Sequence, residues 1–356
     1  MCSSDLCSAT SSIEFNLVAV LEMALNNGKH PLMNWKLGPD TGIIGQGDFE
    51  TFDDFWKAFK EQCEFLCEQS IIGNNQLGEI YQQHQPAPLI SSMTEGCIES
   101  GRGVTRGGAR YNSSGVSVIG MADVVDSLMA IKTLVYDEKK ITFAELKEAI
   151  DSNFAHHPRL HVMIKTRVPR FGSGNEESVT MANRVTSLVH DYFASHQNYR
   201  GGPHATGWWS MANHTVYGRV TGASPSGRLA GEPFTPGLTP HPTASPNLLD
   251  NLRDVAKLKP ETLDNNIAFN VKIVPASSDS HERIIEIMAN YADTYFRMGG
   301  MQTQFNVIST ETLKDAMAHP EYYSDLMVRI SGFVAYFTRL QRDLQLEVIR
   351  RAEYKI

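Results

Sequence analysis

The chain has 356 residues, of which 42% are hydrophobic and 20% are charged, and its formal net charge is −8 at pH 7. This length allows two domains or one large one, and this composition excludes a disordered chain. No apolar run reaches the roughly 18 residues of a membrane-spanning helix, and the acidic balance argues against nucleic acid as the main partner. Neither a membrane nor a nucleic acid is therefore expected as a partner.

The five cysteines have no regular spacing, which favours a reducing cytoplasm over a disulfide scaffold. The first residues lack a basic residue ahead of an apolar run, so we expect no secretory signal. Residues 1–12 also lack hydrophobic periodicity. We interpret them as an unstructured leader, with an artefactual origin as one explanation.

Apolar residues recur at helical spacing over 13–27, and Asn26-Asn27-Gly28 ends that pattern, which predicts a helix. Thr51 is the expected N-cap of a second helix, whose apolar stripe reaches Cys67. Further helices are expected over 122–134, 143–153, 176–196, 282–297 and 340–353, and strands over 116–119, 267–274 and 302–307. Strands that alternate with helices predict an α/β fold. Five of the sixteen prolines fall within 231–246, which predicts an ordered, extended loop.

Three local motifs have both a structural and a functional interpretation. Cys63 and Cys67 are spaced as a metal or redox pair, but they lie within an aromatic stripe and are interpreted as core residues. The glycine-rich run 101–108 lacks the Gly-Lys-Ser/Thr ending of a phosphate-binding loop and is interpreted as a turn. The scattered histidines, His214 among them, are interpreted as surface or locally bonded side chains.

Cys97 lies between Glu95 and Glu99, an arrangement that suggests a nucleophile with a general base. Neighbouring anions raise the pKa of a thiol and lower its thiolate fraction, which disfavours a conventional thiolate nucleophile. Hydrogen-atom chemistry would still be open to this cysteine, because it uses the neutral S–H group.

The C-terminal segment 326–337 reads on composition alone as a strand with a bend at Gly332. The string Arg329-Ile330-Ser331-Gly332-Phe333 also resembles the radical-bearing loop of the glycyl radical enzymes, the family that includes pyruvate formate-lyase. The usual form of that loop is Arg-Val-Ser/Ala-Gly-Tyr, so Phe333 departs from it, and Met327 is atypical as well. Further segments that resemble the family are 24–28, 37–42, 107–112, 227–233, 299–307, 311–316, 319–323 and 344–349. The resemblance runs from about residue 13 to residue 356.

The resemblance implies that Gly332 is the catalytic residue that stores an unpaired electron. Glycine suits this role because the adjacent amide nitrogen and carbonyl delocalise the electron and no side chain crowds the radical carbon. The family passes the radical to a cysteine, whose thiyl form takes a hydrogen atom from a small organic substrate. No bound cofactor is implied. Instead, a separate activating enzyme with an iron–sulfur cluster and S-adenosylmethionine installs the radical, in an anoxic setting.

The resemblance also implies a fold, a ten-stranded α/β barrel built as two half-barrels and wrapped by helices, with the glycine loop and the cysteine loop meeting inside the barrel. On this interpretation the chain is the second half of such a barrel. Residues 13–230 would form the C-terminal part of the barrel domain, and residues 231–356 the glycyl radical domain. The full-length protein is expected to be a homodimer, and the chain alone is expected to expose apolar faces and to be poorly soluble.

The thiyl cysteine of the family lies in a Gly-Cys-x-Glu loop, which Gly96-Cys97-Ile98-Glu99 imitates. In the family, however, the helix that matches 24–28 follows the catalytic loop, whereas here it precedes Cys97. We therefore expect the true loop to lie upstream of residue 13 and to be absent. Cys2 and Cys7 are near that point, but neither is followed by x-Glu.

The resulting hypothesis is a fragment of a lyase that cleaves C–C or C–heteroatom bonds by hydrogen-atom abstraction, and the fragment alone is expected to be inactive. Segments 236–245 and 263–270 resemble the decarboxylase or dehydratase branches of the family more than pyruvate formate-lyase itself. Our preferred hypothesis is an arylacetate decarboxylase, in which His30 and Glu95 or Glu99 would contact the substrate. The alternatives are a radical dehydratase or formate acetyltransferase-type enzyme, a non-catalytic truncated or spare-part chain, and an α/β binding domain with chance similarity.

Overall fold

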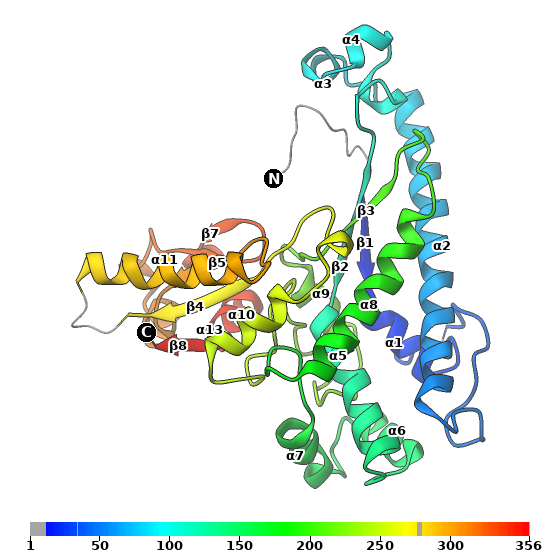
Figure 1. Cartoon of the computed structure of the whole chain (residues 1–356), viewed down its shortest axis with the longest axis vertical. Helices are drawn as coiled ribbons and strands as arrows, with labels where there is room; N and C mark the ends of the chain where they lie inside the picture. Colours follow the sequence, from blue (N-terminus) through cyan, green and yellow to red (C-terminus); the bar gives the residue numbers. More distant parts are fainter. Residues whose placement is uncertain (1–11, 34, 276–279, 356) are drawn as a thin grey trace.

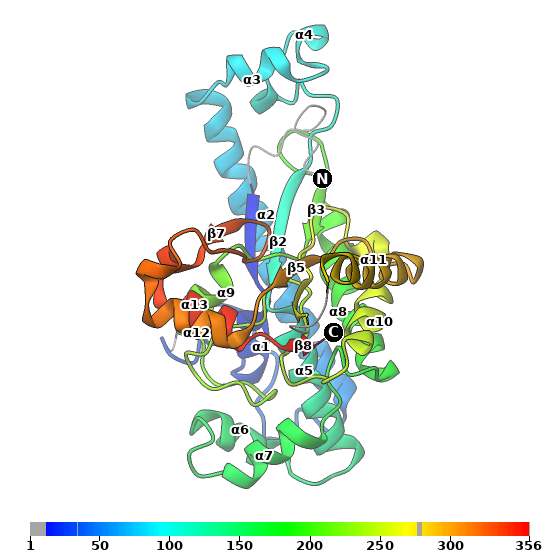
Figure 2. The same ribbon diagram turned by 90° about the vertical axis from the view of Figure 1, so that its left-hand side faces the viewer.

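The computed structural model describes residues 12–33, 35–275 and 280–355. Figure 1 shows an upright body, drawn in blue to green, from which the C-terminal segment in yellow to red projects sideways. Figure 2 shows the same elongated body with a small lobe at one end. The α/β class predicted from the sequence is confirmed by the alternation of strands and helices.

The first sheet contains three parallel strands in the order β1-β2-β3, which are Ser12–Asn16, Ser114–Ile119 and His204–Gly207. The prediction of one helix over 13–27 is wrong at its start. Ile13 and Phe15 are buried and Glu14 is exposed, which is the alternation of a strand. Asn16 then caps helix α1, Leu17–Leu25, by accepting hydrogen bonds from the N–H groups of Val18 and Ala19.

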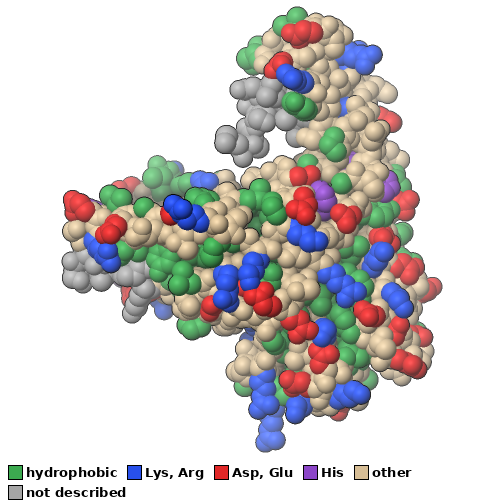
Figure 3. Space-filling model, viewed as in Figure 1, with side chains coloured by type: hydrophobic (Ala, Val, Ile, Leu, Met, Phe, Trp, Pro, Cys, Tyr) green, Lys and Arg blue, Asp and Glu red, His purple; other side chains and the backbone are tan. Residues whose placement is uncertain are grey.

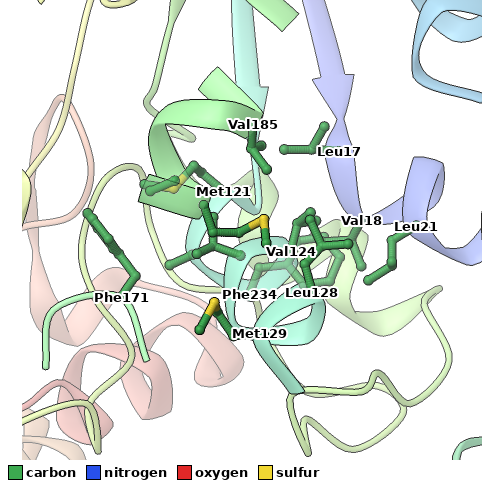
Figure 4. Close-up of a cluster of buried hydrophobic side chains, with 14 of the residues drawn as sticks. Leu17, Val18, Leu21, Met121, Val124, Leu128, Met129, Phe171, Val185 and Phe234 are labelled. Carbon is green, nitrogen blue, oxygen red and sulfur yellow. The ribbon is translucent and has the colours of Figure 1, made fainter. Parts of the chain in front are cut away.

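Long helices cover this sheet. Helix α2 is Phe52–His84, and it begins at the expected capping box of Thr51 and Asp54. The other predicted helices here are α5 (Met121–Ala130), which continues as a π-helical segment (Ile131–Asp137), α6 (Phe143–Asp151) and α8 (Glu176–Ala194), while α7 (Pro158–Arg167) was not expected. Figure 4 shows Val18 and Leu21 of α1 beside Val124 and Leu128 of α5, and Leu17 of α1 beside Val185 of α8, all of them buried. This continuous apolar core holds the body together.

The small lobe carries helices α3 (Pro88–Met93) and α4 (Cys97–Ser100) and a 3₁₀ turn (Val104–Arg106). Its own minor core is formed by Cys97, Val104 and Ala109. In the run 101–108, a side chain at Gly108 would collide with the carbonyl of Arg102, which is the close backbone approach of a structural turn.

The second sheet has the parallel order β5-β4-β8, formed by Gln304–Val307, Asn270–Val274 and Glu353–Lys355. A parallel bridge between Trp208 and Ile267 joins the end of β3 to the segment before β4. The helices of this region are α9 (Asn213–Arg219), α10 (Leu248–Ala256), α11 (His281–Arg297), α12 (Thr310–Ala318) and α13 (Arg342–Arg350). Residues 231–246 form no helix or strand, as their prolines predict.

A two-stranded antiparallel hairpin, β6 (Met327–Arg329) and β7 (Val334–Tyr336), lies on a second apolar cluster. Val328, Ile330 and Phe337 contribute to this cluster from the hairpin, and Leu344 and Val348 contribute from α13. The cluster fixes the strands of the hairpin, and the tip of the hairpin extends beyond it to contact the body.

The molecular surface in Figure 3 shows acidic and basic side chains intermingled, without one dominant charged patch on that face. Among the helices that the structure describes, none combines the length and apolarity needed to cross a bilayer.

Candidate functional site

Gly332 lies at the tip of the hairpin β6–β7. The strands pair from Met327 with Tyr336 to Arg329 with Val334, and the N–H of Ile330 donates to the carbonyl of Phe333 over 3.0 Å. Gly332 has a φ of +97°, in the left-handed region that glycine adopts at little cost. The bend expected at this glycine is therefore the turn of a hairpin.

The surroundings of the Gly332 carbon are open on one side and aromatic on the other. A Cβ atom placed on Gly332 would lie 3.4 Å from Cε3 and 3.9 Å from Cζ3 of Trp209, which are ordinary contacts. Gly332 itself is exposed, and so are the neighbouring hairpin side chains Met327, Val334 and Tyr336, at 61%, 49% and 41%. The interior position implied for this glycine by the family barrel is thus not present within the part of the chain that the structure describes.

Two side chains of strand β5 hold the hairpin tip. Oε1 of Gln304 accepts the Gly332 N–H over 3.3 Å and the Arg329 Nε–H over 3.1 Å. Oδ1 of Asn306 accepts the backbone N–H of Arg329 over 2.8 Å, and its Nδ2 donates to the carbonyl of Arg329 over 2.9 Å. Gln304 therefore contacts the candidate glycine, whereas Asn306 contacts only the strand that leads to it.

The other side of the tip is tied to the body through Ser331, which is fully buried. Its Oγ accepts hydrogen bonds of 3.2 Å from both the N–H and the hydroxyl of Ser210. Oγ of Ser210 also lies 3.0 Å from Nδ1 of His214 in helix α9. The residue next to Gly332 is thereby held by a segment that directly follows strand β3.

A buried ion pair completes these contacts. Glu347 and Arg351 of the α13 region form two hydrogen bonds of 2.9 and 2.7 Å, and Nε2 of His214 lies 3.4 Å from Oε2 of Glu347. Burial acts to raise the pKa of Glu347, but the Arg351 charge and the His214 contact outweigh it and hold the pKa at about 2. Nη1 of Arg351 donates to the carbonyl of Arg329 over 2.9 Å. Glu347 is therefore an anion at neutral pH, and it links the hairpin to the body.

Cys97 is not brought to Gly332. It is buried in the small lobe, which Figures 1 and 2 place away from β7, and burial followed by the charge of Glu99 raises the pKa of its thiol. Cys63 and Cys67 are buried in α2, which confirms their core role, and burial raises the pKa of Cys67 well above its ordinary value. Cys2 and Cys7 lie outside the described residues.

The three residues predicted to contact the substrate make local structural interactions instead. Glu95 pairs with Arg110 over 2.8 Å, and Glu99 accepts the N–H of Gly96 at the start of α4. Nδ1 of His30 accepts the N–H of Met33 in the turn after α1. None of these three candidates belongs to the contacts described around Gly332: His30 lies in the turn after α1, and both glutamates lie in the small lobe.

Sequence reasoning missed the roles of Ser210, His214 and Glu347. His214 does bond locally to Ser210, as predicted, but it is completely buried and also reaches Glu347. The available signal was Glu347 inside the apolar stripe of Leu344 and Val348, since a lone acid there needs a partner.

A cavity of about 220 Å³ lies on another side of the Glu347–Arg351 pair, lined also by Arg228, Phe234 and Asn270. Gly332 does not line it. Within residues 12–33, 35–275 and 280–355 there is no cluster of three or more His, Cys, Asp or Glu side chains suited to a metal ion.

Two family models match the chain. The model described as "Pyruvate formate lyase-like" covers residues 7–218, and the model described as "Glycine radical" covers residues 234–338, which include Gly332.

Curated relatives cover nearly the whole chain. Trans-4-hydroxy-L-proline dehydratase of Clostridioides difficile is 30% identical over 341 residues, which are 95% of this chain and 42% of that protein. (2S)-3-sulfopropanediol dehydratase of Klebsiella oxytoca is 28% identical, over 95% of this chain and 41% of that protein. Indoleacetate decarboxylase of Tractidigestivibacter scatoligenes is 30% identical, over 96% and 41%. The chain therefore spans about two fifths of the length of these relatives.

Solved structures agree with this similarity. The hydroxyproline dehydratase of Clostridioides difficile with its substrate superposes with a TM-score of 0.91 at 30% identity, over 96% of this chain and 43% of that one. The glycerol-bound B12-independent glycerol dehydratase of Clostridium butyricum superposes with a TM-score of 0.90 at 31% identity, again over 96% and 43%.

Proposed function

The chain belongs to the pyruvate formate-lyase-like glycyl radical enzymes, and from this membership we propose that Gly332 stores the unpaired electron of a radical lyase. The observation that carries the proposal is the exposed Gly332 carbon at a hairpin tip within the glycine-radical match. An accessible Cα without a side chain is what hydrogen-atom abstraction requires.

The proposed activation step removes one hydrogen atom from Gly332. One Cα–H bond breaks homolytically, and the hydrogen leaves with one electron to an acceptor supplied by an S-adenosylmethionine- and iron–sulfur-dependent activating enzyme. The other electron stays on Cα and spreads over the amide nitrogen and the carbonyl. This activating enzyme is the proposed partner, and the proposed setting is an anoxic cytoplasm.

An exposed radical would react with oxygen or solvent. We therefore propose that another segment of the full-length protein covers the Gly332 carbon. The apolar side chains Met327, Val334 and Tyr336 around the tip are suited to contact with protein rather than water. We propose that a cysteine loop outside the described residues covers Gly332 and takes a hydrogen atom from the substrate as a thiyl radical. The full-length protein is proposed to be a homodimer.

The strand arrangement supports the proposal of half a barrel. Strands β1, β2 and β3 are parallel neighbours in chain order, the bridge from Trp208 to Ile267 leads to β4, and β5 follows. Strand β8, which pairs with β4 on the edge opposite β5, is not counted here, and the five strands β1 to β5 would supply half of a ten-stranded barrel. In that arrangement residues 13–230 belong to the barrel domain and residues 231–356 to the glycyl radical domain.

The proposed reaction is the cleavage of a C–C or C–heteroatom bond in a small organic substrate. The relatives include dehydratases of hydroxyproline and sulfopropanediol and a decarboxylase of indoleacetate. A dehydratase therefore has the same support as the arylacetate decarboxylase favoured by the sequence, and a formate acetyltransferase-type reaction is a further alternative.

A second candidate function is a spare-part chain that carries the radical without turnover of its own. It is favoured by one observation. The cysteines that the structure describes, Cys63, Cys67 and Cys97, lie buried in α2 and α4 rather than at the hairpin tip.

Cleavage by oxygen tests the proposed function. After anoxic activation, exposure to air is expected to cut the chain at Gly332 and release a fragment that ends near Ser331, identified by mass spectrometry. The Gly332→Ala variant is expected to stay intact. Gly47→Ala, at an equally positive φ of +88° with nothing within 4 Å, is the control and should be cut like the wild type. An intact wild-type chain after air exposure, despite activation, would refute the proposed function.

A further inference from the structure

Two contacts hold the chain directly before the Gly332 carbon. The N–H of Gly332 donates to Oε1 of Gln304, and the preceding Ser331 is bound by Ser210. Gln304 is about 5% exposed and Ser331 is fully buried, so these contacts are shielded from water although the tip itself is open.

The two ties belong to one closed circuit of polar contacts. From Gln304 the circuit passes to Arg329 and from the Arg329 carbonyl to Arg351. It continues through the Glu347 carboxylate to His214, then to Ser210 and back to Ser331. The members of this circuit, which we name the Gly332 clamp, are Ser210, His214, Gln304, Arg329, Ser331, Glu347 and Arg351.

Within the clamp, Gln304 is the member whose side chain touches the backbone of Gly332 itself. The rest of the clamp holds Gln304 in place, because its Oε1 also accepts the Nε–H of Arg329, and Arg329 is fixed in turn by Asn306 and Arg351. An acceptor held this way is oriented before any ligand or partner arrives.

The orientation of this amide controls a glycine-centred electron. Delocalisation onto the amide nitrogen needs the peptide plane to align with the plane of the radical carbon. At a φ of +97° the preceding peptide is far from that alignment, so φ must change when the hydrogen atom leaves. The buried Ser331 and the bond to Gln304 hold the peptide that precedes the Gly332 carbon, so the change in φ turns the carbon and the chain that follows it relative to this fixed N–H.

We propose that Gln304 is a positioning residue of the radical site, whose Oε1 holds the Gly332 N–H and thereby sets the peptide orientation in which the unpaired electron is stored. This inference rests on the proposed function. It adds a residue that neither abstracts a hydrogen atom nor contacts the substrate, and it acts through the geometry of the radical carbon.

The test compares three substitutions in strand β5. Gln304→Leu removes the acceptor, whereas Gln304→Glu keeps an oxygen that can accept from both Gly332 and Arg329. Asn306→Leu is the matched control, because Asn306 is equally buried in the same strand and bonds the same arginine without touching Gly332. Circular dichroism verifies that each variant is folded.

Two readouts separate positioning from general stability. Amide hydrogen exchange at Gly332, before activation, is expected to accelerate about fivefold in Gln304→Leu, the effect of losing one ordinary hydrogen bond. After anoxic activation, the α-proton splitting of the electron paramagnetic resonance signal is expected to change and the signal to decay faster. Gln304→Glu is expected to behave like the wild type in both readouts. Asn306→Leu loosens Arg329 but leaves the Gly332 N–H its acceptor, so it is expected to change each readout less than Gln304→Leu does.

The inference is overturned if folded Gln304→Leu shows wild-type exchange and a wild-type spectrum, or if Asn306→Leu changes the spectrum as much as Gln304→Leu does. A wild-type chain that yields no glycine-centred signal would instead refute the proposed function. The two failures are therefore distinguishable.

Discussion

The buried carboxylate of Glu347 helps to hold the exposed hairpin tip that carries Gly332. It receives two hydrogen bonds from Arg351 and a contact from His214, all of them within the protein interior. Removal of one partner from such a pair leaves the other charge buried and unpaired, which is strongly destabilising.

Glu347→Gln is therefore expected to lower the free energy of unfolding by about 3–5 kcal/mol, measured by urea denaturation at pH 7. Because the pKa of Glu347 is lowered from 4.5 to about 2, its contribution is present above pH 4.5 and is lost as the pH falls towards 2. Glu286→Gln, which removes an exposed partner of Arg283, is the control and should cost less than about 1 kcal/mol. Equal losses in the two variants would contradict this role.

Glu22 has the opposite behaviour. Its Oε1 accepts the N–H of Gly222 over 2.8 Å, and burial raises its pKa from 4.5 to about 7. The folded state thus binds this proton more tightly than the unfolded state, and stability should fall as the pH rises from 4.5 to 7.

Glu22→Gln is expected to remove that dependence, since a neutral amide has no proton to lose. Between pH 4.5 and pH 7.5, the free energy of unfolding of the variant should rise relative to that of the wild type by up to roughly 3 kcal/mol. Urea midpoints at both pH values measure this change. Parallel pH profiles for the two proteins would exclude the proposed protonation of Glu22.

At the scale of single elements, helix α2 depends on its first turn. Thr51 accepts the N–H of Asp54, and Asp54 accepts the N–H of Thr51, which satisfies two backbone donors at the helix start. Thr51→Ala is expected to cost about 1 kcal/mol of stability, measured by thermal or urea unfolding. Thr180→Ala, at an exposed position inside α8, should stay within about 0.5 kcal/mol, and a similar cost in both variants would argue against the capping role.

Helices were predictable where their signals are local. The stripe and cap of α2, and the apolar periodicity of α11, are contained in neighbouring residues, and both helices are found. Strand β1 was missed because its partner is Ser114–Ile119, about a hundred residues away, and because Leu17–Leu25 supplies a helical period directly after it. A five-residue strand that leads into a helix carries too short an alternation to show its own period.

The candidate site was predictable only in part for the same reason. A short signature around Gly332 identified the hairpin tip as the segment of interest. Ser210 and Ser331 are 121 positions apart, and nothing in either segment indicates the other. His214 and Glu347 likewise gain their significance only when α9 and α13 pack together.

At the scale of the whole molecule, large apolar side chains are exposed in many segments, and the lobe of α3 and α4 carries several of the most exposed ones. In the lobe of α3 and α4, Leu89, Ile90, Met93 and Ile98 are 73%, 57%, 67% and 72% exposed. Soluble proteins usually cover groups of exposed apolar side chains by contact with another surface.

The chain on its own is therefore expected to self-associate, which matches the poor solubility predicted from its resemblance to part of a larger barrel. Analytical ultracentrifugation should give a mass above the 39.6 kDa of one chain. Combined Leu89→Ser and Met93→Ser substitutions should shift the distribution towards the monomer. A wild-type chain that is monomeric at every concentration tested would show that these apolar side chains do not drive self-association.

The central claim concerns one carbon atom, and its most direct measurement is electron paramagnetic resonance after anoxic activation. One hydrogen remains on the radical carbon of Gly332, so the wild type should give a doublet, and protein labelled with α-deuterated glycine should give a collapsed signal. Gly332→Ala should give no such signal, while Gly47→Ala should retain it. A doublet that survives in Gly332→Ala, or that is insensitive to deuterated glycine, would contradict the assignment of the electron to this residue.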